Sequence, residues 1–192
     1  MKNKDDIKST LRIYLNELVA INSSLEIYIS MKHNKDWIKI YKISPTYFKL
    51  VRKSLIENNL ISLSRFFDKK RRDGCEYSLE SYIPILKENY NKNIDITNVI
   101  EEFEKCIIEN EPFIKNLKVW RDKVLAHSDE EYYIDKSELA SDAPISIEAL
   151  KSLIASVFEF INCIYSNFGN SMACDKYTEY EDYKNLLNLV NK

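Results

Sequence analysis

Apolar residues recur along much of the chain at alternating intervals of three and four residues, the spacing that keeps one stripe of a helix facing its neighbours. The longest such runs predict two helices, one over residues 7–28 and one over residues 147–168. The first run comprises Ile7, Leu11, Tyr14, Leu18, Ile21, Leu25 and Tyr28, and the second comprises Ile147, Leu150, Ile154, Val157, Ile161, Ile164 and Phe168. Runs of this length are typical of the long helices of a bundle.

Shorter apolar runs predict three further helices. Runs over residues 96–107 and 113–124 are separated by Pro112, a residue type that breaks or kinks a helix. Another helix is expected to begin at Ser44 and Pro45, a capping residue followed by proline at the first helical position, and to extend to Phe66. Its apolar residues cover two sides, so we expect it to lie centrally in the bundle.

Capping residues predict two accessory helices. Ser78 precedes a short helix that extends to about Tyr90, and Thr178 precedes a terminal helix. Gly169 is expected to end the second long helix. The connections between helices are then residues 33–43, 68–77 and 128–144.

Composition agrees with an all-α fold. Two glycines and four prolines in 192 residues are too few turn formers for a sandwich or barrel of many short strands. With 45% hydrophobic residues the chain can close one substantial core, which predicts a single domain over residues 1–192. We therefore expect a bundle of at least four long helices with accessory helices.

Charge and the rare residue types narrow the function classes. A net charge of −2 argues against a protein that coats nucleic acid by bulk attraction, so any contact with RNA has to be local. Two histidines, and four cysteines without a C-x-x-C pair, predict no metal site and no cofactor, although a carboxylate-only Mg²⁺ site stays open. We interpret Cys75, Cys106, Cys163 and Cys174 as reduced thiols.

No long apolar segment and no signal peptide are present, which predicts a cytoplasmic protein without a membrane partner.

One segment concentrates residues that can carry chemistry, at the end of an apolar helix. Residues 120–129 contain Arg121, Asp122, Lys123 and His127. A guanidinium presents a rigid fork of donors that matches phosphate oxygens, and an imidazole can transfer a proton near neutral pH without a metal. These groups suffice for cleavage of a phosphodiester by its adjacent 2′-hydroxyl, with Lys123 as a second cation.

Ideal helix geometry does not bring the two central residues together. Six residues at ~100° each place Arg121 and His127 about 120° apart around the helix. They converge only if the long Arg side chain reaches round or if the helix unwinds near Ala126. The structural alternative is that Arg121 and Asp122 form surface ion pairs while His127 interacts with the last helix carbonyls.

The same segment resembles a known family. Residues 121–127, Arg-Asp-Lys-Val-Leu-Ala-His, resemble the R-x(4–6)-H motif of the HEPN superfamily. Residues 63–68, Leu-Ser-Arg-Phe-Phe-Asp, together with Ser-Leu-Glu at 78–80 and Ala-His-Ser-Asp at 126–129, are similar to the abortive-infection U2-like subgroup. The resemblance implies a metal-independent endoribonuclease, commonly dimeric, in which the Arg and His of both copies meet in a cleft. A second copy's His127 would supply the acid that complements the base. Asp129 stands where the HEPN toxins that pair with nucleotidyltransferases have a tyrosine, so control by modification of that tyrosine is not predicted.

Several neighbouring residues have both a functional and a structural interpretation. Asp129 either orients His127 by a hydrogen bond or solvates the connection. Arg65 and Asp68 lie three residues apart, which favours a structural ion pair, with substrate binding by Arg65 as the alternative. Tyr132 either stacks on a base or belongs to the core or surface. The charged run at residues 68–73 is either an RNA contact or a solvated loop, and His33 is interpreted as a loop residue.

The leading hypothesis is a bacterial defence or toxin-type endoribonuclease that cleaves RNA through Arg121 and His127 across a homodimer. Asp122 would hold Arg121 or the histidine in position, and an inhibitory partner protein would be one means of restraint. The rival hypothesis is a non-catalytic helical module that binds a nucleotide, RNA or protein at the same pocket. A third is a structural dimer whose motif residues stabilise the interface.

Overall fold

The computed structural model describes residues 4–68, 78–90, 93–126, 140–167, 182–185 and 188. Every secondary-structure element in these ranges is a helix, and none of them contains a strand. The predicted all-α helix bundle is therefore confirmed. No helix within these ranges is both long and apolar enough to cross a bilayer.

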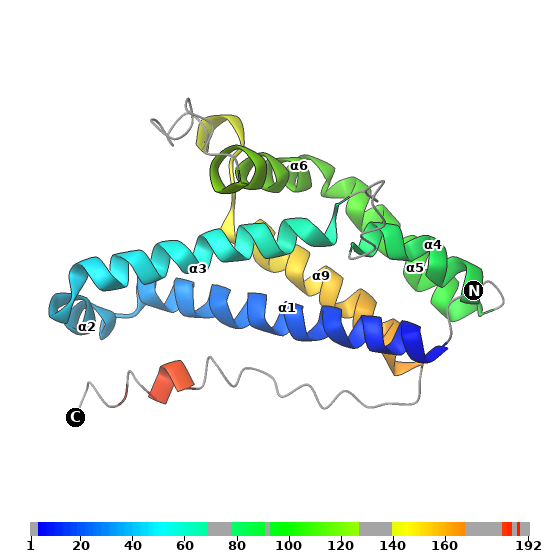
Figure 1. Cartoon of the computed structure of the whole chain (residues 1–192), viewed down its shortest axis with the longest axis horizontal. Coiled ribbons are helices and arrows are strands. Elements are labelled where there is room, and N and C mark those ends of the chain that lie inside the picture. Colours follow the sequence, from blue (N-terminus) through cyan, green and yellow to red (C-terminus); the bar gives the residue numbers. More distant parts are fainter. Residues whose placement is uncertain are drawn as a thin grey trace.

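The three longest described helices form the body of the molecule. They are α1 (Lys4–His33), α3 (Pro45–Phe66) and α9 (Ile147–Ser166). Helix α5 (Ile94–Glu109), with 16 residues, is the fourth long helix. Helix α1 packs along both α3 and α9, as Figure 1 shows. The two long helices predicted from the apolar spacing correspond to α1 and α9, and their stripe residues contribute to one continuous core, apart from Phe168, which lies outside the described residues.

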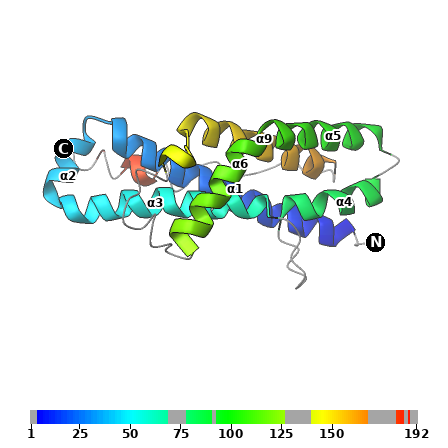
Figure 2. The same ribbon diagram turned by 90° about the horizontal axis from the view of Figure 1, so that it is seen from above.

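Three shorter helices pack on this body. They are α4 (Leu79–Tyr90), α5 (Ile94–Glu109) and α6 (Glu111–Trp120). Helices α4 and α5 lie towards the end that carries the N-terminus (Figures 1 and 2). Helix α5 packs against α9, and α6 crosses α3, as seen from above in Figure 2. The break predicted at Pro112 falls at Asn110, which separates α5 from α6 and leaves the proline in the first turn of α6.

Side-chain caps account for three of the helix starts. The Ser78 hydroxyl accepts a hydrogen bond from the Ser81 backbone N–H at 3.1 Å, as predicted for the start of α4. Asn93 caps α5 and Ser146 caps α9 in the same way. Ser44 precedes α3 as expected, but its side chain makes no capping hydrogen bond.

The structure corrects three expectations about this part of the fold. Residues 33–43 are not a plain connection, because Trp37–Ile43 forms the short helix α2 and His33 is the last residue of α1 rather than a loop residue. Helix α3 is central only in its second half, where its buried residues begin at Asn59. Residues 140–142 form a helical turn inside the predicted 128–144 connection.

Aromatic contacts join the helices in the core. The ring of Tyr14 on α1 lies 5.6 Å from that of Phe66 on α3 and 5.9 Å from that of Tyr82 on α4. Phe103 and Phe160 stack between α5 and α9 with ring centroids 4.0 Å apart. The contact of Tyr14 with Phe66 packs the C-terminal end of α3, which leads to the site described next, against α1. Gly169 and Thr178 lie outside the described residues.

Candidate functional site

Arg121 stands at a change of helix type. Helix α6 ends at Trp120, and the chain continues as a π-helical turn, η1 (Arg121–Ala126), packed against α3. A π-helical segment is rare, and single turns of this kind often occur at functional sites. Unwinding of the helix near Ala126 was one of two conditions under which Arg121 and His127 could converge. The structure shows a π-helical turn that begins at Arg121 instead.

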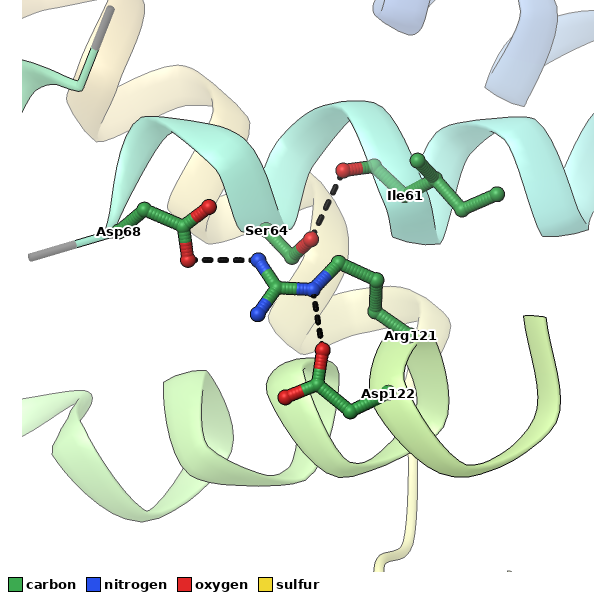
Figure 3. Close-up of polar contacts among 5 residues, drawn as sticks. All are labelled: Ile61, Ser64, Asp68, Arg121 and Asp122. Carbon is green, nitrogen blue, oxygen red and sulfur yellow. Dashed lines mark hydrogen bonds and ion pairs between the residues drawn. The ribbon is translucent and has the colours of Figure 1, made fainter. Parts of the chain in front are cut away.

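The Arg121 guanidinium is held between two carboxylates from different elements (Figure 3). Its Nη1 donates to Asp68 Oδ1 at 2.5 Å, and its Nε donates to Asp122 Oδ1 at 2.7 Å. The Arg121 side chain is 17% exposed, whereas those of Asp68 and Asp122 are 32% and 52% exposed. The arginine is thus largely enclosed while its partners reach the solvent.

These contacts raise the pKa of Arg121 above its usual value. The hydrogen bond to Asp122 raises the pKa most, burial lowers it, and the hydrogen bond and charge of Asp68 raise it again. Arg121 is therefore a permanent cation. A guanidinium carries five N–H donors, and the contacts with Asp68 and Asp122 occupy two of them. Neither contact uses the other three N–H groups, which could donate to a substrate.

The end of α3 explains how Asp68 reaches Arg121. Phe66 and Phe67 are both buried and fix the last turn, so Asp68 follows at a defined place. Ser64, one turn earlier, is fully buried, and its hydroxyl donates to the Ile61 carbonyl at 2.8 Å. Figure 3 shows the Ser64 side chain on the side of α3 that faces Arg121.

Asp68 belongs to the Arg121 site, although its position in the sequence suggested another partner. The spacing favoured an ion pair with Arg65, but Asp68 instead binds Arg121, 53 residues away in the chain. Arg65 is exposed, and its charge acts on Glu17 of α1. The pKa of Glu17 is raised because burial outweighs the attraction of Arg65. The signal that pointed to Asp68 was its place in the family-like stretch at residues 63–68.

Two of the other predicted site residues, Asp122 and Lys123, can be located in the structure. The expected contact of Asp122 with Arg121 is present, and Lys123 lies exposed in η1. His127, Asp129 and Tyr132 lie outside the described residues, so the convergence of Arg121 and His127 stays a prediction.

The chain returns to the same helix after these residues. The Trp120 indole Nε1 donates to the Ala143 carbonyl at 2.7 Å, and Asn116 Nδ2 donates to the Pro144 carbonyl at 3.0 Å. The described chain therefore leaves η1 at Ala126 and is in contact with α6 again at Ala143 and Pro144.

Other groups that could support chemistry are few in the part of the chain that is described. It contains no cluster of three or more His, Cys, Asp or Glu side chains placed to hold a metal ion. Cys106 and Cys163 are free, half-buried thiols that line one groove of about 160 Å³ between α5 and α9. Cys75 and Cys174 lie outside the described residues.

Comparison with known families identifies the class of protein. The chain matches the AbiU2 family of HEPN proteins over residues 7–186, which includes the bundle and the whole Arg121 site. The protein therefore belongs to the AbiU2 family within the HEPN superfamily. No curated protein and no solved structure shows a significant match to it.

Proposed function

We propose that this protein is a metal-independent endoribonuclease of bacterial defence or toxin type, acting in the cytoplasm as a homodimer. The observation that carries the proposal is the Arg121 guanidinium, held by Asp68 and Asp122 at the start of a π-helical turn that leads directly into His127. Membership of the HEPN superfamily supports the same class of activity.

In this mechanism a 2′-hydroxyl of the RNA attacks the adjacent phosphorus atom. One His127 accepts the proton of the hydroxyl, and His127 of a second copy protonates the departing 5′-oxygen. The products are a 2′,3′-cyclic phosphate and a free 5′-hydroxyl. Arg121 donates to the non-bridging oxygens, whose negative charge increases as the five-coordinate phosphorane forms. Lys123 adds a second cation, and Asp129, Tyr132 and Arg65 are proposed to bind or position the substrate.

The two carboxylates fix the position of Arg121 rather than its charge. An arginine is cationic in any environment, so the gain from Asp68 and Asp122 is a guanidinium that does not have to be ordered when the substrate binds. Their negative charge also lowers the attraction of the site for phosphate in general. We infer that RNA must bind through several contacts along its backbone before the phosphate reaches Arg121.

The test is cleavage of a mixed, end-labelled RNA pool by purified protein in the presence of a chelator. The wild type is expected to produce fragments with 2′,3′-cyclic phosphate ends, and His127→Ala and Arg121→Ala are expected to lose this activity. His33→Ala and Arg12→Ala are matched controls, because both residues are exposed on α1. Absence of cleavage by folded, dimeric wild type would refute the proposal, as would equal cleavage by the wild type and His127→Ala.

A second function is favoured by one observation, the pairing of Arg121 in the unbound chain. An arginine that already has two carboxylate partners is suited to a permanent structural or binding role. In that case the protein is a non-catalytic module that binds a nucleotide, RNA or a protein partner. Retained RNA or nucleotide binding without cleavage, weakened by Arg121→Ala, would support this alternative.

A further inference from the structure

One end of the molecule exposes an unusual number of large apolar side chains. This end, called the tip here, comprises residues 32–53: the last turn of α1, all of α2 and the first part of α3 (Figures 1 and 2). Its exposed apolar residues and their exposed fractions are Ile38 (59%), Tyr41 (37%), Ile43 (73%), Tyr47 (58%) and Leu50 (61%). Only two other large apolar residues of the described chain, Ile13 and Ile108, are comparably exposed. An apolar patch of this kind marks an interaction surface.

The tip is also strongly basic. Residues 32–53 contain seven Lys and Arg residues and one acidic residue, Asp36, in a chain whose net charge is −2. One further carboxylate, the exposed Asp182, lies next in sequence to Tyr183, whose ring is 5.9 Å from that of Trp37 on α2. All seven cations are exposed. Two of them form ion pairs that partly offset their charge, Lys39 with Asp36 and Lys53 with Glu57. A third, Arg52, lies over the Tyr28 ring.

The opposite end of the molecule has the opposite charge. Residues 94–111, which include α5, carry six acidic residues and one basic residue, Lys105. Figures 1 and 2 both place α2 at one end of the long axis and α5 towards the other. Among the described residues, positive charge therefore gathers at the tip and negative charge along α5, and a negatively charged plane would favour the orientation with the tip inward.

The chemistry of the patch distinguishes among possible occupants. The three most exposed apolar residues, Ile43, Leu50 and Ile38, are aliphatic, so a nucleotide base could stack only on Tyr41 or Tyr47. Tyr41 is the least exposed residue of the patch, and the ring of Tyr47 already packs against Phe48 with centroids 5.0 Å apart. A second copy applied symmetrically to this surface would bring seven cations against seven like charges. Aliphatic side chains, tyrosines and lysines in alternation are instead the combination found where a protein lies on an anionic bilayer, because the lysine stems lie along apolar surface while their amines reach the headgroups.

We propose that the tip binds peripherally to an anionic lipid bilayer. Ile43 and Leu50 enter the boundary between headgroups and acyl chains, and Lys42 and Lys49 contact the phosphate groups. The absence of a spanning helix led to the expectation of no membrane partner, and a peripheral contact of this kind needs none. The proposal is independent of the endoribonuclease function: Ser64, beside Arg121, is 14 residues beyond Leu50, which is about 21 Å along α3.

The test is co-sedimentation of the full chain with vesicles. One set contains equal amounts of phosphatidylglycerol and phosphatidylcholine, and the other contains phosphatidylcholine alone. Binding is expected only to the anionic set and should weaken as salt is added. Lys42→Ala with Lys49→Ala should weaken it about 25-fold, because each basic residue near an anionic surface contributes a factor of about five. Ile43→Ser and Leu50→Ser should each weaken it about tenfold.

Matched controls come from the acidic end. Ile108 is 69% exposed and Lys105 is exposed, both on α5, so Ile108→Ser and Lys105→Ala remove the same chemistry at the wrong end. These variants, and Arg121→Ala, should bind vesicles as the wild type does. The proposal is overturned by the absence of vesicle binding, by equal binding to both vesicle sets, or by control variants that lose as much affinity as the tip variants. It is also overturned if the tip variants weaken binding of RNA or of an acidic protein while the wild type ignores vesicles.

Discussion

The ion pair between Arg121 and Asp68 joins η1 to the end of α3, and a double-mutant cycle can measure its contribution to folding. The perturbations are Asp68→Ala, Arg121→Ala and the double variant. The coupling free energy is the part of the double variant's destabilisation that the two single changes do not account for. It isolates the pair from the packing lost with the arginine stem.

The structure sets the expected magnitude. Exposed ion pairs contribute about 0–1 kcal/mol, and hydrogen bonds to charged groups contribute about 1.5–3 kcal/mol. The Arg121 side chain is 17% exposed and that of Asp68 is 32% exposed, so the pair lies between these cases. Asp122 still binds Arg121 in Asp68→Ala, which spares the cost of an unpaired buried charge. We expect a coupling of about 1.5 kcal/mol.

The assay is urea unfolding followed by far-ultraviolet circular dichroism, at two protein concentrations so that dimer dissociation is recognised. The Lys87–Glu104 pair between α4 and α5 is the control, since its N–O distance is 2.8 Å but its side chains are 46% and 37% exposed. Its coupling should be about 0.5 kcal/mol and should fall in high salt, while the Arg121–Asp68 coupling should persist. A coupling for Arg121–Asp68 within about 0.5 kcal/mol of zero would refute the idea that Asp68 fixes the arginine.

Three further changes test other features. Ser78→Ala removes the cap of α4 and should lower the free energy of unfolding by about 1 kcal/mol in a urea titration. A leucine variant of similar cost fits the same role. A glycine variant that costs as much as the alanine variant would contradict a capping role, because glycine is tolerated at this position. Glu17→Gln should raise stability at neutral pH, because burial raises the pKa of Glu17 so that folding favours the protonated form. The difference should vanish below pH 4.5, where the wild-type carboxyl is also protonated in the unfolded chain, and a pH-independent difference would exclude this cause. Trp120→Phe leaves the buried Ala143 carbonyl without its donor and should cost about 1–3 kcal/mol by thermal unfolding, whereas an unchanged midpoint would show that water replaces the indole.

The long helices could be predicted from the sequence because each buries a continuous stripe. Apolar residues at intervals of three and four identified α1 and α9, and Pro112 marked the boundary between α5 and α6. The short helix α2 was missed, since seven residues complete only two turns and buried Trp37 and Ile40 alternate with exposed apolar residues. Intrinsic periodicity carries little information over such a length.

The site was predictable in part. The type and spacing of the polar residues identified Arg121 and its neighbour Asp122, which do contact each other. The partner Asp68 depends on how α3 and α6 cross, and no local spacing specifies a contact over 53 residues. The π-helical turn is likewise a product of tertiary packing, since its sequence differs in no clear way from that of an α-helix.

The anchoring of Ala143 and Pro144 on α6 has a consequence for how the family can diversify. Because the described chain leaves η1 at Ala126 and returns to α6 at Ala143 and Pro144, length added between these points does not require the bundle to rearrange. The entropy of closing a flexible segment between two fixed points grows only with the logarithm of its length, so doubling that length costs about 0.6 kcal/mol. Insertions and deletions between Ala126 and Ala143 should therefore destabilise the fold little and leave the contacts of Arg121 with Asp68 and Asp122 unchanged.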